Sequence, residues 1–371
     1  MSLVELLEGR RLLVCVGPGG VGKTTLGAAL AIAAARRGQR VAVITIDPAR
    51  RLADALGLDG LDDALRPVAG VGPGTLHAAM LDTKSSYDAL IHRVTGDPEA
   101  RRRILDNRVY QSFSRTLARS HAYVAMERLH DVLDGGYDLV VLDTPPTRSA
   151  LDILDAPARL VRFLDERVLG AFLGHGGRGG AASWLKSKGT EVALRLFGAL
   201  VGDGLMQELA GFFEVFFHLR TGFAERAASV QYALRADGTA FVLVSAPRAT
   251  HLADAAYLRD GLLERGAPIE AVLFNRAFHA DERGQPVGAA APYAAEAVRP
   301  DPSDRVAASA LRAAQALRGR LAVENAALDR AMRGLVAGVP RAHVRLRFPL
   351  LDEEPATVEA LEQLLASAAV V

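Results

Sequence analysis

The sequence predicts an α/β fold, a doubly wound and mostly parallel sheet with an inserted helical subdomain. Short apolar runs rich in β-branched residues alternate with helical patterns through much of the chain, whereas two long blocks show helical patterns only. The composition agrees with this fold class, because half of the 371 residues are hydrophobic and 23% are charged, with a formal net charge of +1. Such a chain has ample material for a core and is not a disordered polar chain.

The strands of the sheet are predicted at short apolar runs that helical patterns separate. The run Val41–Ile46 (VAVITI) is apolar on both of its faces, which is typical of a parallel strand buried between two helix layers. Before it, Thr24–Arg37 is an alanine- and leucine-rich helix that Gly38 closes. The predicted strands are Arg11–Val16, Val41–Ile46, Leu76–Leu81, Leu139–Leu142, Ala240–Ser245, Glu270–Phe274 and His343–Phe348.

Two long blocks without strand patterns interrupt this alternation, and we expect them to form one helical subdomain. The second block contains a glycine-rich break at residues 174–180, typical of a loop, and a helix at Leu205–Leu219 that is apolar over more than half its circumference. That helix either packs in the core or lines an apolar groove, and both alternatives stay open. The predicted division is residues 85–135 and 151–235 for the helical subdomain, and residues 1–84, 136–150 and 236–371 for the sheet domain.

A glycine-rich loop stands between the first predicted strand and the first predicted helix. It matches the phosphate-binding pattern G-x-x-x-x-G-K-S/T in the strand–loop–helix context that the pattern needs. Glycines allow backbone N–H groups to point into an anion nest, to which the helix N-terminus adds partial positive charge. Lys23 would reach the β- and γ-phosphates, and the Thr24 hydroxyl would bind Mg²⁺. The nucleotide-binding residues predicted in this loop are Gly17, Gly19, Gly20, Val21, Gly22, Lys23, Thr24 and Thr25.

Two aspartates stand where predicted strands end: Asp47 follows the second strand, and Asp143 closes the run DLVVLD. A carboxylate at the tip of a strand beside a phosphate-binding loop is where a Walker B residue holds Mg²⁺, directly or through water. The loop also spells G-x-G-x-x-G, with Asp47 as the ribose acid of a dinucleotide-dependent oxidoreductase. That alternative leaves Lys23, Thr24 and Thr25 unexplained.

The motifs around these residues resemble those of the ArsA-like ATPases, which include the arsenite-pump ATPases and the ATPases that target tail-anchored membrane proteins. The shared features, in the same order, are the G-G-V-G-K-T-T loop, the Asp-Pro-Ala segment at residues 47–49 and the D-T-x-P-T segment at residues 143–147. Asn275, Arg276 and Pro349 are similar in position to the residues on the family's adenine side. The resemblance covers essentially the whole chain and implies a P-loop NTPase of the deviant Walker A class.

The resemblance also implies the chemistry and the partners. It implies an ATPase with ATP and Mg²⁺ as cofactors, in which Lys23 and Asp47 are catalytic and Asp47 orients the attacking water. Thr24, Asp47 and Asp143 would surround the magnesium ion, the two carboxylates through water. It further implies a homodimer that works as a nucleotide-driven carrier, chaperone or targeting factor, with a hydrophobic protein client in the helical subdomain. We expect a cytoplasmic protein, because no secretory signal precedes the first strand pattern and no stretch of 18 apolar residues occurs. A ParA/MinD-like nucleotide-switched positioning or scaffold protein is the alternative.

The sequence departs from the family pattern at the loop lysine. The family carries a lysine directly after the first glycine, which reaches the partner's phosphates across the dimer, and here that residue is Pro18. We therefore expect slow hydrolysis unless another cation substitutes for the lysine, and an arginine acting in trans is one solution. Arg50, Arg51 and Arg148 are the candidates, although we favour solvated helix residues for Arg50 and Arg51.

The single cysteine, Cys15, limits the ligands that we expect. One thiolate excludes an internal disulfide framework, an arsenite site and a structural zinc site held by paired cysteines. The near-zero net charge gives no support for a nucleic-acid partner. We expect no stable membrane anchor, because no run of 18 apolar residues occurs and the last predicted helix, Thr357–Ala369, has no basic polar face.

Overall fold

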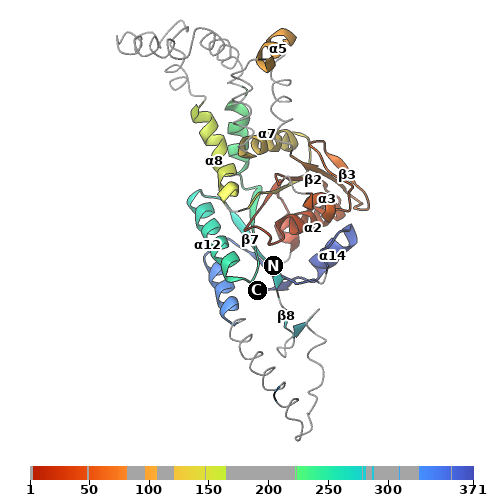
Figure 1. Cartoon of the computed structure of the whole chain (residues 1–371), viewed down its shortest axis with the longest axis vertical. Coiled ribbons are helices and arrows are strands. Elements are labelled where there is room, and N and C mark those ends of the chain that lie inside the picture. Colours follow the sequence, from red (N-terminus) through yellow and green to blue (C-terminus); the bar gives the residue numbers. More distant parts are fainter. Residues whose placement is uncertain are drawn as a thin grey trace, which may run out of the picture. The chain divides into compact units, whose positions relative to one another are not determined.

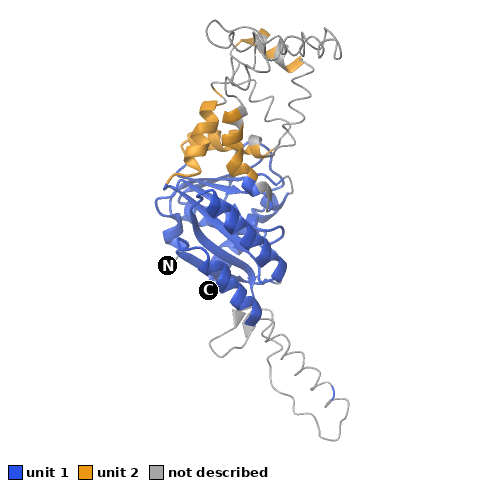
Figure 2. Cartoon of the chain, turned by 90° about the vertical axis from the view of Figure 1, so that its left-hand side faces the viewer, with its two compact units in different colours: residues 1–80, 137–151, 237–371 blue, residues 81–136, 152–236 orange. Residues whose placement is uncertain are grey.

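The computed structural model divides into two compact units, coloured separately in Figure 2. Unit 1 comprises residues 1–80, 137–151 and 237–371, and unit 2 comprises residues 81–136 and 152–236. The predicted assignment of the chain to a sheet domain and an inserted helical subdomain stays a prediction. The residues that the structure describes are 3–47, 50–81, 97–106, 121–146, 148–163, 222, 224–277, 279–280, 286–287, 309, 326–351 and 353–371.

Unit 1 is built on a mostly parallel sheet, which confirms the predicted fold class. The strand order is β11-β10-β7-β6-β1-β5-β2-β4-β3, with parallel pairing from β10 through to β4 and antiparallel pairing at both edges. The strands are β1 (Leu12–Val16), β2 (Arg40–Thr45), β3 (Arg66–Val68), β4 (Thr75–Met80), β5 (Leu139–Asp143), β6 (Thr239–Ser245), β7 (Ile269–Ala277), β10 (Val344–Pro349) and β11 (Ala369–Val370).

All seven predicted strands are confirmed, with bounds that shift by three residues or fewer. The sequence pattern missed β3 and β11, the two antiparallel edge strands, because segments of three and two residues are too short to show a period. It also missed the short hairpin of β8 (His279–Ala280) and β9 (Pro286–Val287). All of these lie away from the central strands that carry the predicted motifs.

Helices cover both faces of the sheet in unit 1 (Figure 1). On one face α2 (Lys23–Arg36) and α14 (Val358–Ala366) pack with alternate residues of the central strands, among them Val141 and Val242. On the other face α12 (Ala249–Glu264) contacts β6 and β7. Because the central strands are covered twice, both of their faces are apolar, as the sequence pattern predicts. The short helices α1 (Leu3–Leu7) and α3 (Arg51–Ala55) complete this unit together with a helix at residues 326–337.

The described part of unit 2 is helical, with α5 (Pro98–Asp106), α7 (His121–Asp134), most of α8 (Arg148–Phe163) and a helix at residues 224–233. Arg226 joins two of these helices, since Nε donates to Glu127 Oε2 of α7 at 2.6 Å and Nη2 donates to Asp131 of the same helix. The predicted glycine-rich loop at residues 174–180 and the apolar helix at Leu205–Leu219 lie outside the described residues. Among the helices that are described, none is long and apolar enough to cross a bilayer.

Candidate functional site

A cleft of about 280 Å³ lies at the carboxyl end of the parallel strands in unit 1. Loops that follow parallel strands meet at this edge, and open α/β sheets bind their ligands there. The cleft brings together the glycine-rich loop, the segment after β2, the end of β5, the end of β7 and the loop before α14. The described residues that line it are Gly20, Gly22, Lys23, Thr24, Thr25, Asp47, Arg51, Asp54, Ala55, Thr144, Arg276, Glu354, Pro355 and Ala356.

Glycine is required at specific positions of the loop. A Cβ on Gly17 would lie 2.1 Å from the backbone oxygen of Val244 on β6, so the loop can pass β6 this closely only without a side chain. Gly20 and Gly22 have φ values of 73° and 88°, a left-handed backbone that glycine adopts without strain. The loop therefore turns its backbone toward the start of α2, as a phosphate nest requires.

One contact holds the loop against the sheet, and a second closes the loop on the start of α2. Val21 is fully buried in the core, and its backbone oxygen accepts a hydrogen bond from Asn275 Nδ2 at 3.0 Å. At the other side of the loop, the Lys23 ammonium donates to the backbone oxygen of Pro18 at 2.9 Å. Burial lowers the pKa of Lys23, with smaller opposing contributions from Asp143 and Asp47. A phosphate in the cleft would favour the charged ammonium and replace its contact with Pro18.

The Walker B aspartate predicted from sequence lies beside the loop. Thr24 Oγ1 donates to Asp143 Oδ2 at 2.7 Å, which brings residues of β5 and α2 together across 119 positions of sequence. Asp143 is 1% exposed, and burial raises the pKa of its carboxyl group against the lowering effect of the Thr24 hydrogen bond and of Lys23. Its second oxygen, Oδ1, is buried without a hydrogen-bond partner in the described structure. A hydroxyl and a carboxylate with one free oxygen are ligands that Mg²⁺ accepts, so these residues fit the predicted ion.

Asp47 lines the same cleft, and its catalytic role stays a prediction. Its carboxylate accepts a hydrogen bond from Arg51 Nη1 at 3.3 Å, four residues along the chain, and it is 22% exposed on its side chain. Arg51 therefore faces the cleft, whereas Arg50 donates to the backbone oxygen of Asp59. Of the three arginines considered as substitutes for the missing lysine, Arg51 alone is seen at the cleft, and the side chain of Arg148 lies outside the described structure.

The three residues predicted on the adenine side lie in different places. Arg276 lines the cleft, has a left-handed backbone with φ of 57°, and forms an ion pair with Glu354. Asn275 is buried beneath the loop, and its Nδ2 donates a hydrogen bond to the backbone oxygen of Val21. Pro349 is the last residue of β10 and pairs with Ala277 of β7. Neither Asn275 nor Pro349 is among the described lining residues, so an adenine contact for them stays a prediction.

Sequence reasoning missed two groups of residues at this site. Glu354, Pro355 and Ala356 form one wall of the cleft, but nothing in their local sequence marks them, because they reach the cleft through the return of the chain to β10 and α14. Thr45 was also missed, although a signal existed. Within the run VAVITI it is the one polar residue, and it is fully buried.

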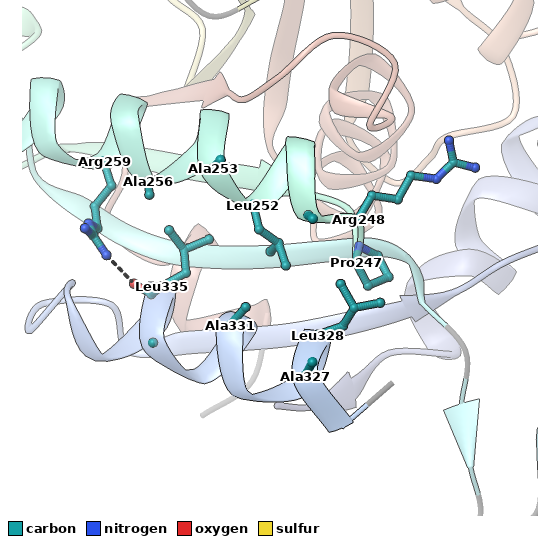
Figure 3. A pocket seen from close by; sticks show the side chains of 12 residues that line it. Pro247, Arg248, Leu252, Ala253, Ala256, Arg259, Ala327, Leu328, Ala331 and Leu335 are labelled. Carbon is teal, nitrogen blue, oxygen red and sulfur yellow. Dashed lines mark hydrogen bonds between the residues drawn. The ribbon is translucent and has the colours of Figure 1, made fainter. Parts of the chain in front are cut away.

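A larger cavity of about 650 Å³ lies elsewhere in unit 1, between α12 and the helix at residues 326–337. Figure 3 shows Leu252 of α12 on one side of it, and Leu328 and Leu335 of the other helix on the opposite side. Arg259 lies along one end, with Nη1 at 3.5 Å from the backbone oxygen of Leu335, and the Arg248 side chain points away from the groove. The described lining contains neither a carboxylate nor a phosphate-binding loop, so we assign the nucleotide chemistry to the smaller cleft.

Comparison with known proteins points to one family. Residues 10–171 match the profile of the family described as "Anion-transporting ATPase". An arsenical pump-driving ATPase from Acidiphilium multivorum is 30% identical over 166 residues, covering 43% of this chain and 27% of that protein. ATPase ASNA1 homolog 1 from Paramecium tetraurelia is 30% identical over 188 residues, covering 45% of this chain and 50% of that protein. ATPase GET3 from Malassezia globosa is 30% identical over 165 residues, covering 44% of this chain and 48% of that protein. The chain thus spans about a quarter to a half of the length of these relatives.

Proposed function

We propose that this chain is an ArsA-like ATPase, which binds Mg-ATP in the cleft of unit 1 and hydrolyses it; the match of residues 10–171 to the family profile supports this proposal. The observation that carries this proposal is the buried contact of Thr24 with Asp143, next to a loop in which a Cβ at Gly17 or Gly22 would clash and a lysine that donates back to the loop. A P-loop site consists of these parts: a hydroxyl, a carboxylate, a lysine and a nest of backbone N–H groups.

In this proposal each residue of the site has a defined task. The backbone of residues 17–22 and the N-terminus of α2 bind the phosphate oxygens, and Lys23 binds the terminal phosphates as a point charge. Thr24 and Asp143 hold Mg²⁺, which when bound neutralises charge that develops on the phosphates. Asp47 orients a water for attack on the γ-phosphorus, since positioning is the main contribution that a protein makes to phosphoryl transfer.

For the biological role we propose a nucleotide-driven carrier or targeting factor. This proposal is supported by the similarity to an arsenical pump-driving ATPase and to a GET3 ATPase, and by the division of the chain into two units. Residues 85–135 and 151–235 would form the inserted subdomain that receives a hydrophobic protein client. A homodimer in the cytoplasm completes the proposal.

The first test measures ATP binding by titration calorimetry with MgCl₂ and with EDTA. Lys23→Ala is expected to lower the affinity by about 100-fold, roughly 2.7 kcal/mol, because it removes a buried cation from the phosphates. Arg37→Ala, which removes an exposed cation at the other end of α2, is the control and should bind like wild type. Unchanged ATP affinity in a folded Lys23→Ala protein, or preferential binding of NAD, would contradict the proposal.

The second test separates binding from hydrolysis. Asp47→Asn is expected to keep its affinity for Mg-ATP within about threefold but to lose about 100-fold or more in turnover, since the amide no longer orients the water as a carboxylate does. Phosphate release is the measurement. Asp59→Asn changes an exposed carboxylate on the same segment and should leave turnover unchanged. Near wild-type turnover in Asp47→Asn would remove Asp47 from the mechanism.

A further inference from the structure

Thr45 lies between the two carboxylates of the site without being one of the predicted ligands. It is the last residue of β2, is fully buried, and pairs in register with Asp143 on the adjacent parallel strand β5. Two residues later the chain reaches Asp47 at the mouth of the cleft. Thr45 therefore lies where β2 ends and the segment that carries Asp47 begins.

The hydroxyl of Thr45 donates one hydrogen bond and accepts another. Oγ1 donates to Asp143 Oδ2 at 2.8 Å, and it accepts from the backbone N–H of Asp47 at 3.2 Å. A hydroxyl has one proton to donate and lone pairs to accept with, so this arrangement uses the group as a link between a donor and an acceptor. The backbone of Asp47 is thereby tied to the carboxylate of Asp143 through one side chain.

The same contacts decide which oxygen of Asp143 stays available. Thr24 and Thr45 both donate to Oδ2, at 2.7 Å and 2.8 Å, and Oδ1 has no hydrogen-bond partner in the described structure. With both lone pairs of Oδ2 used, the carboxylate presents Oδ1 alone to a new ligand. Valine at position 45 would keep the volume but remove the second donor, and the carboxylate would then be free to rotate.

We propose that Thr45 is a positioning residue, which fixes the Asp143 carboxylate for the magnesium ion and anchors the backbone of Asp47 for the attacking water. The inference rests on the proposed function, because it concerns how the same site holds Mg-ATP. Partners that orient a metal-binding carboxylate typically contribute 10- to 100-fold to metal affinity or activity. Thr45 acts through Asp143 and Asp47 and is not itself expected to touch the nucleotide.

The test compares ATP affinity in MgCl₂ with ATP affinity in EDTA, because their ratio isolates the contribution of the ion from that of the loop. In EDTA, the ATP affinity of Thr45→Val is expected to stay within about twofold of wild type. The factor by which MgCl₂ raises ATP affinity is expected to fall about tenfold or more. Thr45→Ser keeps the hydroxyl and should restore the gain. Thr239→Val is the matched control, a buried threonine at the amino end of β6 in the same sheet.

Each outcome decides between positioning and a merely structural role. Equal loss of affinity in MgCl₂ and EDTA, an unchanged magnesium-dependent gain in Thr45→Val, or no rescue by Thr45→Ser would overturn the inference. Thr45→Ala provides a second truncation if the valine variant does not fold, as judged by circular dichroism and thermal unfolding. If neither variant folds, the hydroxyl is needed for the fold and the positioning role is wrong. Failure of wild-type ATP binding would instead refute the proposed function.

Discussion

At the scale of single residues, glycines of the loop differ in what they require from their surroundings. Gly20 and Gly22 share a left-handed backbone, but a Cβ on Gly20 would meet nothing within 4 Å, whereas a Cβ on Gly22 would lie 2.2 Å from Asn275 Nδ2. The amide of Asn275 in turn holds the backbone oxygen of Val21. Gly22 therefore combines a conformational requirement with a steric one, and Gly20 has only the first.

We predict that Gly22→Ala lowers the free energy of unfolding of unit 1 by about 2–3 kcal/mol, the sum of left-handed strain and a lost hydrogen bond. Gly20→Ala carries only the strain, about 1–2 kcal/mol, and serves as the matched control. Urea unfolding and ATP binding are the measurements. The double variant Gly22→Ala/Asn275→Ala should lose less than the sum of its parts, because the second change removes the clash. Equal effects of Gly20→Ala and Gly22→Ala would show that the Asn275 contact is unimportant.

The sequence predicted those site residues that stand next to one another in the chain. Lys23, Thr24 and the glycines belong to one continuous motif, and Asp143 ends an apolar run, so a local pattern was enough. Glu354 could not be found in this way, because its contact with Arg276 joins positions 78 residues apart and depends on where β10 returns to the sheet. Asn275 was singled out, but the sequence could not tell that its amide holds Val21.

At the scale of elements, the predictable and the unpredictable parts follow from burial. The central strands are covered by helices on both faces and therefore carry long apolar signals, whereas the edge strands β3 and β11 carry none. The wall formed by residues 354–356 leads directly into α14, whose first turn is capped by Thr357 Oγ1 accepting from the backbone N–H of Ala360 at 3.2 Å. The cap thus fixes the point where the wall of the cleft ends and the helix begins.

We predict that Thr357→Ala lowers the free energy of unfolding of unit 1 by about 1 kcal/mol, the usual contribution of an N-cap hydroxyl. ATP affinity should fall with it, since the wall residues precede the cap. Thr357→Ser keeps the acceptor oxygen and should behave like wild type in both urea unfolding and calorimetry. A Thr357→Ala protein with unchanged stability would mean that packing of α14 against α2 holds the wall without help from the cap.

At the scale of the whole molecule, Pro18, the residue after the first glycine of the loop, affects whether two copies of the chain can form a dimer. Pro18 is buried, and its carbonyl oxygen accepts a hydrogen bond from the Lys23 ammonium of the same chain. Proline offers neither an N–H nor a charge, so residue 18 can contribute no cation to a second subunit. If ATP joins two copies of the chain, the phosphates at that interface have one compensating charge fewer than the family pattern provides.

We predict that Pro18→Lys strengthens ATP-dependent dimerisation by about tenfold, roughly 1.4 kcal/mol, with a lysine stem long enough to carry its ammonium out of the buried position. Pro18→Ala is the control for the loss of the ring and should leave the dimer affinity low. Light scattering with ATP, with ADP and without nucleotide is the measurement. Equal dimerisation of the lysine and alanine variants would contradict the missing-charge argument, and a wild-type monomer in saturating ATP would reject the nucleotide-linked dimer.

The cleft wall at residues 354–356 and the helix α14 that follows it are synthesised late, which has a consequence for how the protein is made. Arg36 at the end of α2 pairs with Glu362 of α14, 326 residues later in the chain. At about 5–20 residues per second, the ribosome delivers that second residue roughly 15–65 s after the first. During this interval the growing polypeptide carries the residues of the glycine loop without the opposite wall of the cleft. If the cleft binds ATP as proposed, ATP can stabilise only chains whose synthesis has passed α14.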